Sequence, residues 1–264
     1  MDHLRECAPF DPGRLVRGLA ALGIRDAALF ESTLPGAGQR GRWTLVGFGA
    51  RRRLVFDGAA WSAGGPAPCA PLEAFERVLA GSGPSAWSGL VAAERLLAGM
   101  APGPGPALPG HAPPFRGGFA VALSYDMIRA EPEASWTNRA LDDRPWPWAE
   151  LRLFAAIGAL DHASGRAFWI APQHPFFPDP PAARTAEALA IAERALAAAP
   201  GDDEERATPA ADAPGGLHSN LSDAEYGRAF DRLQEYLRAG DLYQANLTRR
   251  FDAPCALDAP ALYA

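Results

Sequence analysis

The stretch Gly240–Phe251, GDLYQANLTRRF, lies near the end of the 264-residue chain and follows a strong helix signal. Ser222 and Glu225 have the spacing of a capping box, and apolar residues then recur at helical spacing. Gly240 stands where a left-handed residue commonly ends a helix. Side chains alternate along a strand, so in a strand after Gly240 one face would carry Leu242, Gln244, Asn246 and Thr248. The pattern predicts a helix followed by a strand whose polar face is either solvated or lines a polar cavity.

Three segments of the chain resemble one family, in the order in which that family carries them. The segment Tyr226–Phe251 resembles the opening of the chorismate-binding domain in aminodeoxychorismate synthase component I, the large subunit of 4-aminobenzoate synthesis and a sister of anthranilate synthase component I. Leu29–Ser32 with Arg40–Trp43, and the Phe-x-Gly-Gly…Tyr-Asp run Phe115–Asp126, resemble parts of the same family's N-terminal domain. Three ordered matches are stronger evidence than any single motif.

The resemblance implies an α+β fold in which antiparallel sheets are packed with outer helices. We expect an N-terminal domain over residues 1–200, an acidic linker rich in Pro and Gly over 201–218, and the start of the chorismate-binding domain over 219–264. In the family, the acidic Mg²⁺ ligands and the general acid come later in that second domain. We therefore expect the second domain to be truncated here, with no metal ligands, and the chain alone to be inactive.

The same resemblance implies an enzyme of chorismate metabolism. Its reaction is the Mg²⁺-dependent replacement of the chorismate 4-hydroxyl by ammonia, giving 4-amino-4-deoxychorismate for 4-aminobenzoate and folate synthesis. A separate glutamine amidotransferase subunit supplies the ammonia. Family members that add water look to carry Lys at the position of Gln244, where it can act as a general base, whereas ammonia needs no such base. Gln244 is therefore the candidate catalytic position.

Two alternatives stay open at this point. The chain could be a fragment of anthranilate synthase component I, which the resemblance separates only weakly from the aminobenzoate branch. It could also be a non-catalytic module that binds tryptophan or docks a glutaminase.

The family also carries a tryptophan-binding pocket, and the resemblance places its candidate residues at Ser32, Arg40, Gly41, Arg42 and Trp43. A Ser hydroxyl can hold an ammonium or carboxylate group, an Arg adds a counter-charge and a Trp adds an aromatic wall. In the anthranilate enzymes this pocket is a feedback site, whereas in the aminobenzoate enzymes tryptophan can be structural. Alternatively, Ser32 satisfies the backbone of its loop and Trp43 belongs to the core.

Composition argues against a nucleic-acid or membrane partner. The net charge of -6 and the pI near 5.4 disfavour non-specific binding to polyanions. No apolar run is long enough to span a membrane and the N-terminus lacks the order of a signal peptide, so we expect a cytoplasmic protein. The 3 Cys and 5 His residues have no metal-ligand spacing. All 25 basic residues are Arg, which excludes lysine chemistry within this chain.

Local patterns predict several further elements. Asp11-Pro12 predicts a helix start, and helices are also expected from Pro71 and from Pro181. The Asp57-Gly58 turn predicts a hairpin. A second hairpin of two buried strands is expected from Leu151–Leu160 and Ala167–Ile170.

Overall fold

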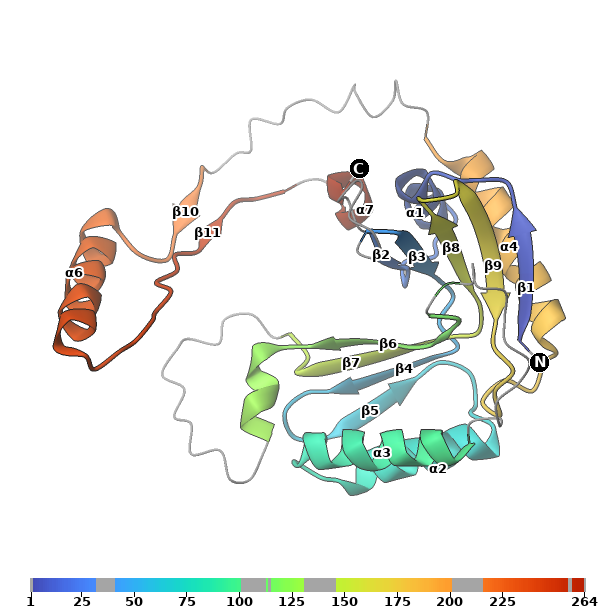
Figure 1. Cartoon of the computed structure of the whole chain (residues 1–264), viewed down its shortest axis with the longest axis horizontal. Coiled ribbons are helices and arrows are strands. Elements are labelled where there is room, and N and C mark those ends of the chain that lie inside the picture. Colours follow the sequence, from blue (N-terminus) through green and yellow to red (C-terminus); the bar gives the residue numbers. More distant parts are fainter. Residues whose placement is uncertain are drawn as a thin grey trace. The chain divides into compact units, whose positions relative to one another are not determined.

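The computed structural model describes residues 2–31, 41–100, 113, 115–130, 146–200, 216–255 and 258–263 (Figure 1). The chain divides into two compact units, Met1–Ala199 and Pro200–Ala264. The predicted linker over residues 201–218 lies outside the described residues as far as position 215.

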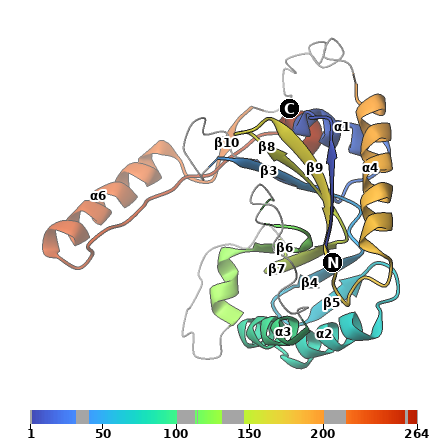
Figure 2. The ribbon, with the colours of Figure 1, turned by 45° about the vertical axis from the view of Figure 1, so that its right-hand side comes forward.

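The first unit contains a five-stranded antiparallel sheet covered on one face by two helices (Figures 1 and 2). Its strands, in spatial order, are β1 (His3–Cys7), β9 (Arg166–Ala171), β8 (Ile157–Asp161), β3 (Trp43–Gly47) and β2 (Ala28–Phe30). The covering helices are α1 (Pro12–Ala21) and α4 (Pro181–Ala198).

A four-stranded antiparallel sheet forms the other half of this unit. Its strands, in spatial order, are β5 (Trp61–Gly64), β4 (Arg52–Phe56), β7 (Ala149–Phe154) and β6 (Gly118–Leu123). Helices α2 (Ala70–Gly81) and α3 (Ala86–Met100) lie against it, and the 3-10 helix η1 (Tyr125–Ala130) follows β6 (Figure 1). The predicted α+β fold, with antiparallel sheets and outer helices, is confirmed.

Strand β9 shows how the first sheet separates two apolar clusters. Trp169 and Ala171 pack on the helix side with Leu15 and Leu19 of α1, whereas Phe168 and Ile170 belong to a cluster on the opposite face. Successive side chains of a strand point to opposite faces, so a strand that is apolar at every position must be covered on both sides.

Helix α1 is fixed by its cap and by one glycine. The Asp11 side chain accepts a hydrogen bond from the backbone N–H of Arg14 at 2.8 Å, and Pro12 occupies the first turn, as predicted. Gly18 is buried against α4, where an added Cβ would lie 1.8 Å from the carbonyl oxygen of Ala195. The absence of a side chain at Gly18 is what allows the two helices to approach this closely.

The predicted hairpin from Leu151 onward is only partly correct. The run Leu151–Leu160 is not one strand, because the chain breaks at Ala155-Ala156 and passes from β7 in one sheet to β8 in the other. Strands β8 and β9 form the antiparallel hairpin. The buried Arg184 of α4 donates to the carbonyl oxygen of Ala155 at 2.5 Å, which satisfies a backbone group freed by this break.

The second unit contains helix α6 (Asp223–Ala239), a short ladder and helix α7 (Ala259–Tyr263). Ser222 and Glu225 form the predicted capping box, and Gly240 is left-handed with φ of 80°. The ladder joins β10 (His218–Ser219) to β11 (Phe251–Asp252).

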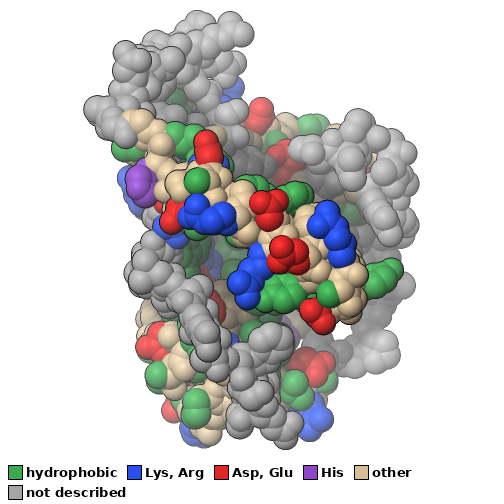
Figure 3. Space-filling view, turned by 90° about the vertical axis from the view of Figure 1, so that its left-hand side faces the viewer, with side chains coloured by type: hydrophobic (Ala, Val, Ile, Leu, Met, Phe, Trp, Pro, Cys, Tyr) green, Lys and Arg blue, Asp and Glu red, His purple; other side chains and the backbone are tan. Residues whose placement is uncertain are grey.

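The predicted strand after Gly240 is wrong in its bounds. Residues 241–250 form no ladder with any described strand, and pairing begins only at Phe251. A strand needs a neighbour for its backbone hydrogen bonds, and the described part of this unit offers one only for β11. No residue of α6 is buried, and Figure 3 shows acidic, basic and hydrophobic side chains interspersed on the face that carries this helix.

Candidate functional site

A cavity of about 570 Å³ lies in the first unit, between the ends of its two sheets. Strand β2 is the last strand of one sheet and β6 is the last strand of the other. The described residues that line the cavity are Ala27–Phe30, Ala120–Ser124, Trp146, Pro147, Glu150 and Arg152. A cavity of this size accommodates a small molecule.

Cross-strand pairing explains why this space is empty of protein atoms. Ala120 of β6 lies opposite Arg152 of β7, and Ala122 lies opposite Glu150. Opposite residues share a face of an antiparallel pair, so two methyl groups stand beside two long polar side chains. The short side chains leave the volume that the cavity occupies.

The wall of the cavity is apolar and exposed. Four of its large side chains keep much of their surface open to solvent: Phe30 at 50%, Val121 at 48%, Leu123 at 44% and Trp146 at 75%. Single exposed apolar residues are ordinary, but a group of them around one cavity marks a binding surface.

Two charged residues, Glu150 and Arg152, form the polar side of the cavity, and Arg53 of β4 pairs with Glu150 from outside its lining. The Glu150 carboxylate accepts hydrogen bonds from Arg53 Nε at 2.8 Å and Nη2 at 3.0 Å, and from Arg152 Nε at 2.5 Å. The hydrogen bonds from Arg53, more than that from Arg152, lower the pKa of Glu150 to about 2, so the carboxylate is charged at neutral pH. Two guanidinium groups share one carboxylate, and the cluster therefore carries net positive charge.

Ser124, directly after β6, adds a polar group that has no side-chain partner among the described residues. Its Oγ is buried and makes no hydrogen bond to them, although its backbone N–H donates to the carbonyl oxygen of Trp148 at 2.8 Å. A buried hydroxyl without a partner is uncommon in folded proteins and often marks a place where a ligand or water completes the hydrogen bonding.

Of the predicted tryptophan-binding residues, the three that the structure describes, Gly41, Arg42 and Trp43, are not among those that line this cavity. Arg42 pairs with Asp161 of β8 at 2.8 and 2.9 Å and lies 5.1 Å over the ring of Trp43. Trp43 packs on Phe168, with ring centroids 6.4 Å apart. Gly41 has φ of 86°, so it acts as a turn residue before β3. Ser32 and Arg40 lie outside the described residues.

Part of the same motif does line the cavity, however. Leu29 and Phe30, which precede Ser32, stand on its wall. Sequence reasoning missed Glu150 and Arg152, although they alternate with the buried Leu151 and Leu153. That period-two pattern of charged residues within a buried strand was the available signal.

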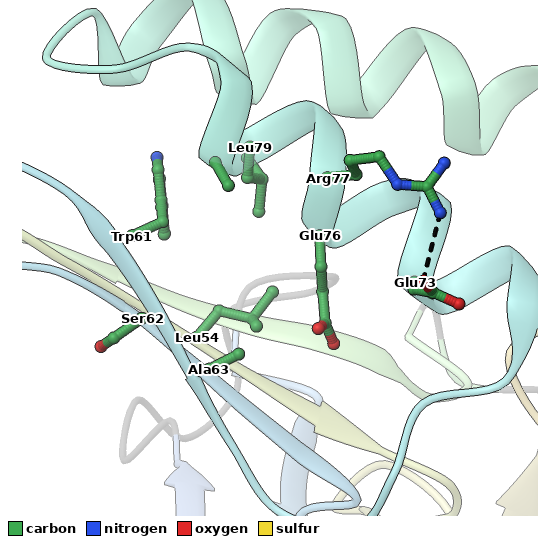
Figure 4. Close-up of a pocket in the computed structure, with 9 residues that line it drawn as sticks. Leu54, Trp61, Ser62, Ala63, Glu73, Glu76, Arg77 and Leu79 are labelled. Atoms are coloured by element: carbon green, nitrogen blue, oxygen red, sulfur yellow. Dashed lines mark hydrogen bonds and ion pairs between the residues drawn. The ribbon is translucent and has the colours of Figure 1, made fainter.

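A second cavity, of about 280 Å³, lies between α2 and the β4–β5 hairpin (Figure 4). Its charged side chains are already engaged: Glu76 binds Arg52 at 2.6 and 2.8 Å, and Glu73 binds Arg77 at 3.3 Å. Leu54 and Leu79 face each other across it (Figure 4). The ion pair between Arg52 of β4 and Glu76 holds α2 on the sheet, whereas Glu73 and Arg77 pair within the helix. The first cavity is the better candidate for a ligand.

Gln244, the predicted catalytic position, lies in the extended segment after α6 and is exposed. The segment is tied down beyond it, because Arg249 donates to Ser219 Oγ and to Asp223 Oδ1, both at 2.6 Å. Tyr243, beside Gln244, is fully exposed. The described residues of the second unit therefore present this segment on a surface.

Comparison with known proteins gives the family. A family model described as chorismate binding enzyme matches residues 83–264, which is more than half of the chain. The chain belongs to the chorismate binding enzyme family. The expectation of a chorismate-utilising synthase is confirmed at this level.

Two relatives of this chorismate binding chain are anthranilate synthase components. The protein named anthranilate synthase component 1 of Cereibacter sphaeroides is 31% identical over 162 residues, which cover 59% of this chain and 31% of that protein. The crystal structure of anthranilate synthase component I from Streptococcus pneumoniae TIGR4 matches with a TM-score of 0.52 and 14% identity, over 89% of this chain and 46% of that one. The structural likeness shows the fold alone. The chain spans about a third of the curated relative and under half of the solved one.

Metal-ligand groups and membrane-spanning helices are both absent from the described residues of this member of the chorismate binding enzyme family. Within the described residues, no group of three or more His, Cys, Asp or Glu side chains is placed to hold a metal ion. Among the described helices, none is both long enough and apolar enough to cross a membrane.

Proposed function

We propose that this chain is part of component I of an aminodeoxychorismate synthase. The complete enzyme converts chorismate and glutamine-derived ammonia into 4-amino-4-deoxychorismate, for 4-aminobenzoate and folate synthesis. The family match over residues 83–264 supports chorismate as the substrate. The choice of ammonia over water rests on Gln244.

The chemistry of the Gln244 side chain supports ammonia as the nucleophile. A carboxamide donates and accepts hydrogen bonds but does not take up a proton at neutral pH, so it cannot activate water as a general base. Ammonia carries its own nucleophilic lone pair and needs only to be positioned. We assign Gln244 a positioning role toward the nucleophile.

A cofactor and a protein partner belong to this proposal. Mg²⁺ is expected in the complete enzyme on the strength of the resemblance, held by residues other than those described here. A glutamine amidotransferase subunit is the proposed ammonia source.

Product identity tests the proposal. The chain is mixed with the complementary C-terminal segment of a related synthase, chorismate, Mg²⁺ and an ammonium salt, and the product is identified by mass spectrometry. Formation of 4-amino-4-deoxychorismate supports the proposal. Formation of anthranilate favours the alternative that the names of the two relatives suggest, namely anthranilate synthase component I. Turnover by the chain alone contradicts the expected inactivity.

The cavity between the sheet ends supports a second function, the binding of L-tryptophan. Its apolar wall and charged side suit an aromatic zwitterion, and Leu29 and Phe30 of the tryptophan-pocket motif line it. The ligand can be regulatory or structural in this role. Tryptophan binding without chorismate binding by the complemented protein would favour the non-catalytic module.

Calorimetry with a cavity-filling variant tests tryptophan binding. Ala122→Trp places a large ring in the cavity, whereas Ala63→Trp places the same ring in the second cavity beside α2. We expect the heat of L-tryptophan binding to vanish in the first variant and to persist in the second. Equal binding by both variants would place the ligand elsewhere.

A further inference from the structure

The side chain of Arg152 reaches from one sheet toward the free edge of the other. It starts on β7 in the four-stranded sheet, and its Nη1 lies 3.5 Å from the carbonyl oxygen of Ala27, just before β2 of the five-stranded sheet. Its Nε donates to Glu150 Oε1 at 2.5 Å. The guanidinium group is therefore oriented from both ends and held at the cavity.

Arg152 retains hydrogen-bonding capacity after these contacts. A guanidinium has five N–H donors, and the contact to Ala27 is at the long limit of a hydrogen bond. Nη2 makes no hydrogen bond to the described residues. Because Arg53 supplies two of the hydrogen bonds to Glu150, that carboxylate leaves part of the Arg152 charge uncompensated.

Arg53 carries the same charge but has a different position. It lies on β4, opposite Arg152 in the ladder, and is not among the residues that line the cavity. Both of its contacts to Glu150 are made through its guanidinium edge. Of the two cations, Arg152 alone lines the cavity.

We propose that Arg152 binds the carboxylate of an aromatic amino acid in this cavity and so determines which ligands the site accepts. The inference rests on the proposed binding of L-tryptophan and adds the residue that recognises its charged end. The carboxylate lies against the free edge of the guanidinium, and the ring lies against the apolar wall that includes Phe30 and Trp146. Charge-assisted hydrogen bonds of this kind are about twice as strong as neutral ones.

The test compares L-tryptophan with L-tryptophanamide by calorimetry at pH 7. The amide keeps the ring and the ammonium group and replaces the carboxylate by a neutral group of similar size. We expect the full chain to prefer L-tryptophan by about tenfold or more, the effect of one hydrogen bond to a charged partner. In Arg152→Gln this preference is expected to fall to within about twofold, through weaker binding of L-tryptophan and little change for the amide.

Matched variants separate recognition from folding. Arg53→Gln also removes a partner of Glu150 and lets that carboxylate compensate more of the Arg152 charge, but it leaves the cavity wall intact, so it is expected to keep the larger part of the preference. Arg152→Lys retains the charge and is expected to keep a reduced preference. Thermal unfolding of each variant checks that it is folded. If Arg152→Gln does not fold, the affinities of the unaltered chain and of Arg152→Lys for L-tryptophan and L-tryptophanamide still test the proposal.

Each outcome bears on the inference. A preference lost in Arg152→Gln and kept in Arg53→Gln supports it. Equal affinity of the unaltered chain for the two ligands, or a preference that survives in Arg152→Gln, overturns it while leaving tryptophan binding in place. Absence of binding of both ligands by the unaltered chain overturns the proposed tryptophan function together with the inference.

Discussion

Replacing Gly18 by Ala tests whether the contact between α1 and α4 fixes the helical layer of the first unit. The new Cβ would lie 1.8 Å from the carbonyl oxygen of Ala195 and 2.5 Å from its carbonyl carbon. Carbon–oxygen contacts are about 3.3 Å or longer, so the helices must separate by about 1.5 Å. That shift also loosens Leu15 and Leu19, which are completely buried at this contact.

The expected loss follows from two opposing effects. Alanine stabilises a helix by about 1 kcal/mol relative to glycine, whereas overpacking a core costs about 1–3 kcal/mol and occasionally more. Because the obstructing atom belongs to the backbone and cannot rotate away, we expect the upper end of that range. The net decrease in unfolding free energy is about 2 kcal/mol, or about 1 M in urea midpoint at a slope of about 2 kcal/mol per molar.

Urea denaturation followed by circular dichroism measures this loss, with Gly13→Ala as the matched control in the same helix. A Cβ at Gly13 meets only side-chain ends, Asp11 Oδ1 at 3.3 Å and Arg17 Nη1 at 3.5 Å. We expect Gly13→Ala to be neutral or slightly stabilising. If Gly18→Ala proves as stable as Gly13→Ala, the close approach of the helices does not constrain this layer and the reasoning fails.

Three further predictions concern polar groups of the first unit. The pKa of Glu150 is about 2 in the folded chain against a usual 4.5, so its contribution to stability is present above pH 4.5 and is lost as the pH falls toward 2. In Glu150→Gln the urea midpoint should therefore fall less between pH 6 and pH 3 than it does in the unaltered chain. An equal fall of the midpoint in both proteins would contradict the assignment. Ser124→Ala removes a buried hydroxyl that has no partner among the described residues, so it should raise the unfolding free energy of the ligand-free chain by up to about 1 kcal/mol, measured by thermal unfolding; a clear loss would mean that Ser124 Oγ has a partner. Arg184→Met should lower the unfolding free energy by about 3 kcal/mol or more, because the carbonyl oxygens of Ala155, Pro172 and Asp179 lose their hydrogen-bond donor. The control is Arg51→Met, which alters an exposed side chain and should change the unfolding free energy by less than about 1 kcal/mol.

The features predicted most accurately from the sequence are helix starts and ends, which depend on neighbouring residues. The caps of α1 and α6 depend on residues three positions apart, so Asp11, Ser222 and Glu225 were enough to place both helix starts. The left-handed Gly240 followed from the same local reasoning.

The cavity could not be predicted because it depends on distant partners. It forms where residues 27–30 meet residues 120–124 and 146–152, and no local pattern indicates which strands end a sheet. Arg42 illustrates the same limit: its partner Asp161 lies 119 residues away, and that ion pair holds Arg42 beside β8. The strand expected after Gly240 was placed too early for a related reason, since a strand pattern does not supply the neighbour that a ladder needs.

The position of the cavity at two sheet edges affects how freely its residues can change during evolution. An edge strand forms ladder hydrogen bonds on only one of its two sides, and the small side chains of Ala120 and Ala122 leave space beside Arg152 and Glu150 on the neighbouring strand. Substitutions that enlarge, narrow or recharge this space therefore need not break a backbone hydrogen bond or disturb the buried clusters. The size and charge of this cavity can consequently change between related chains while the surrounding architecture is inherited unchanged.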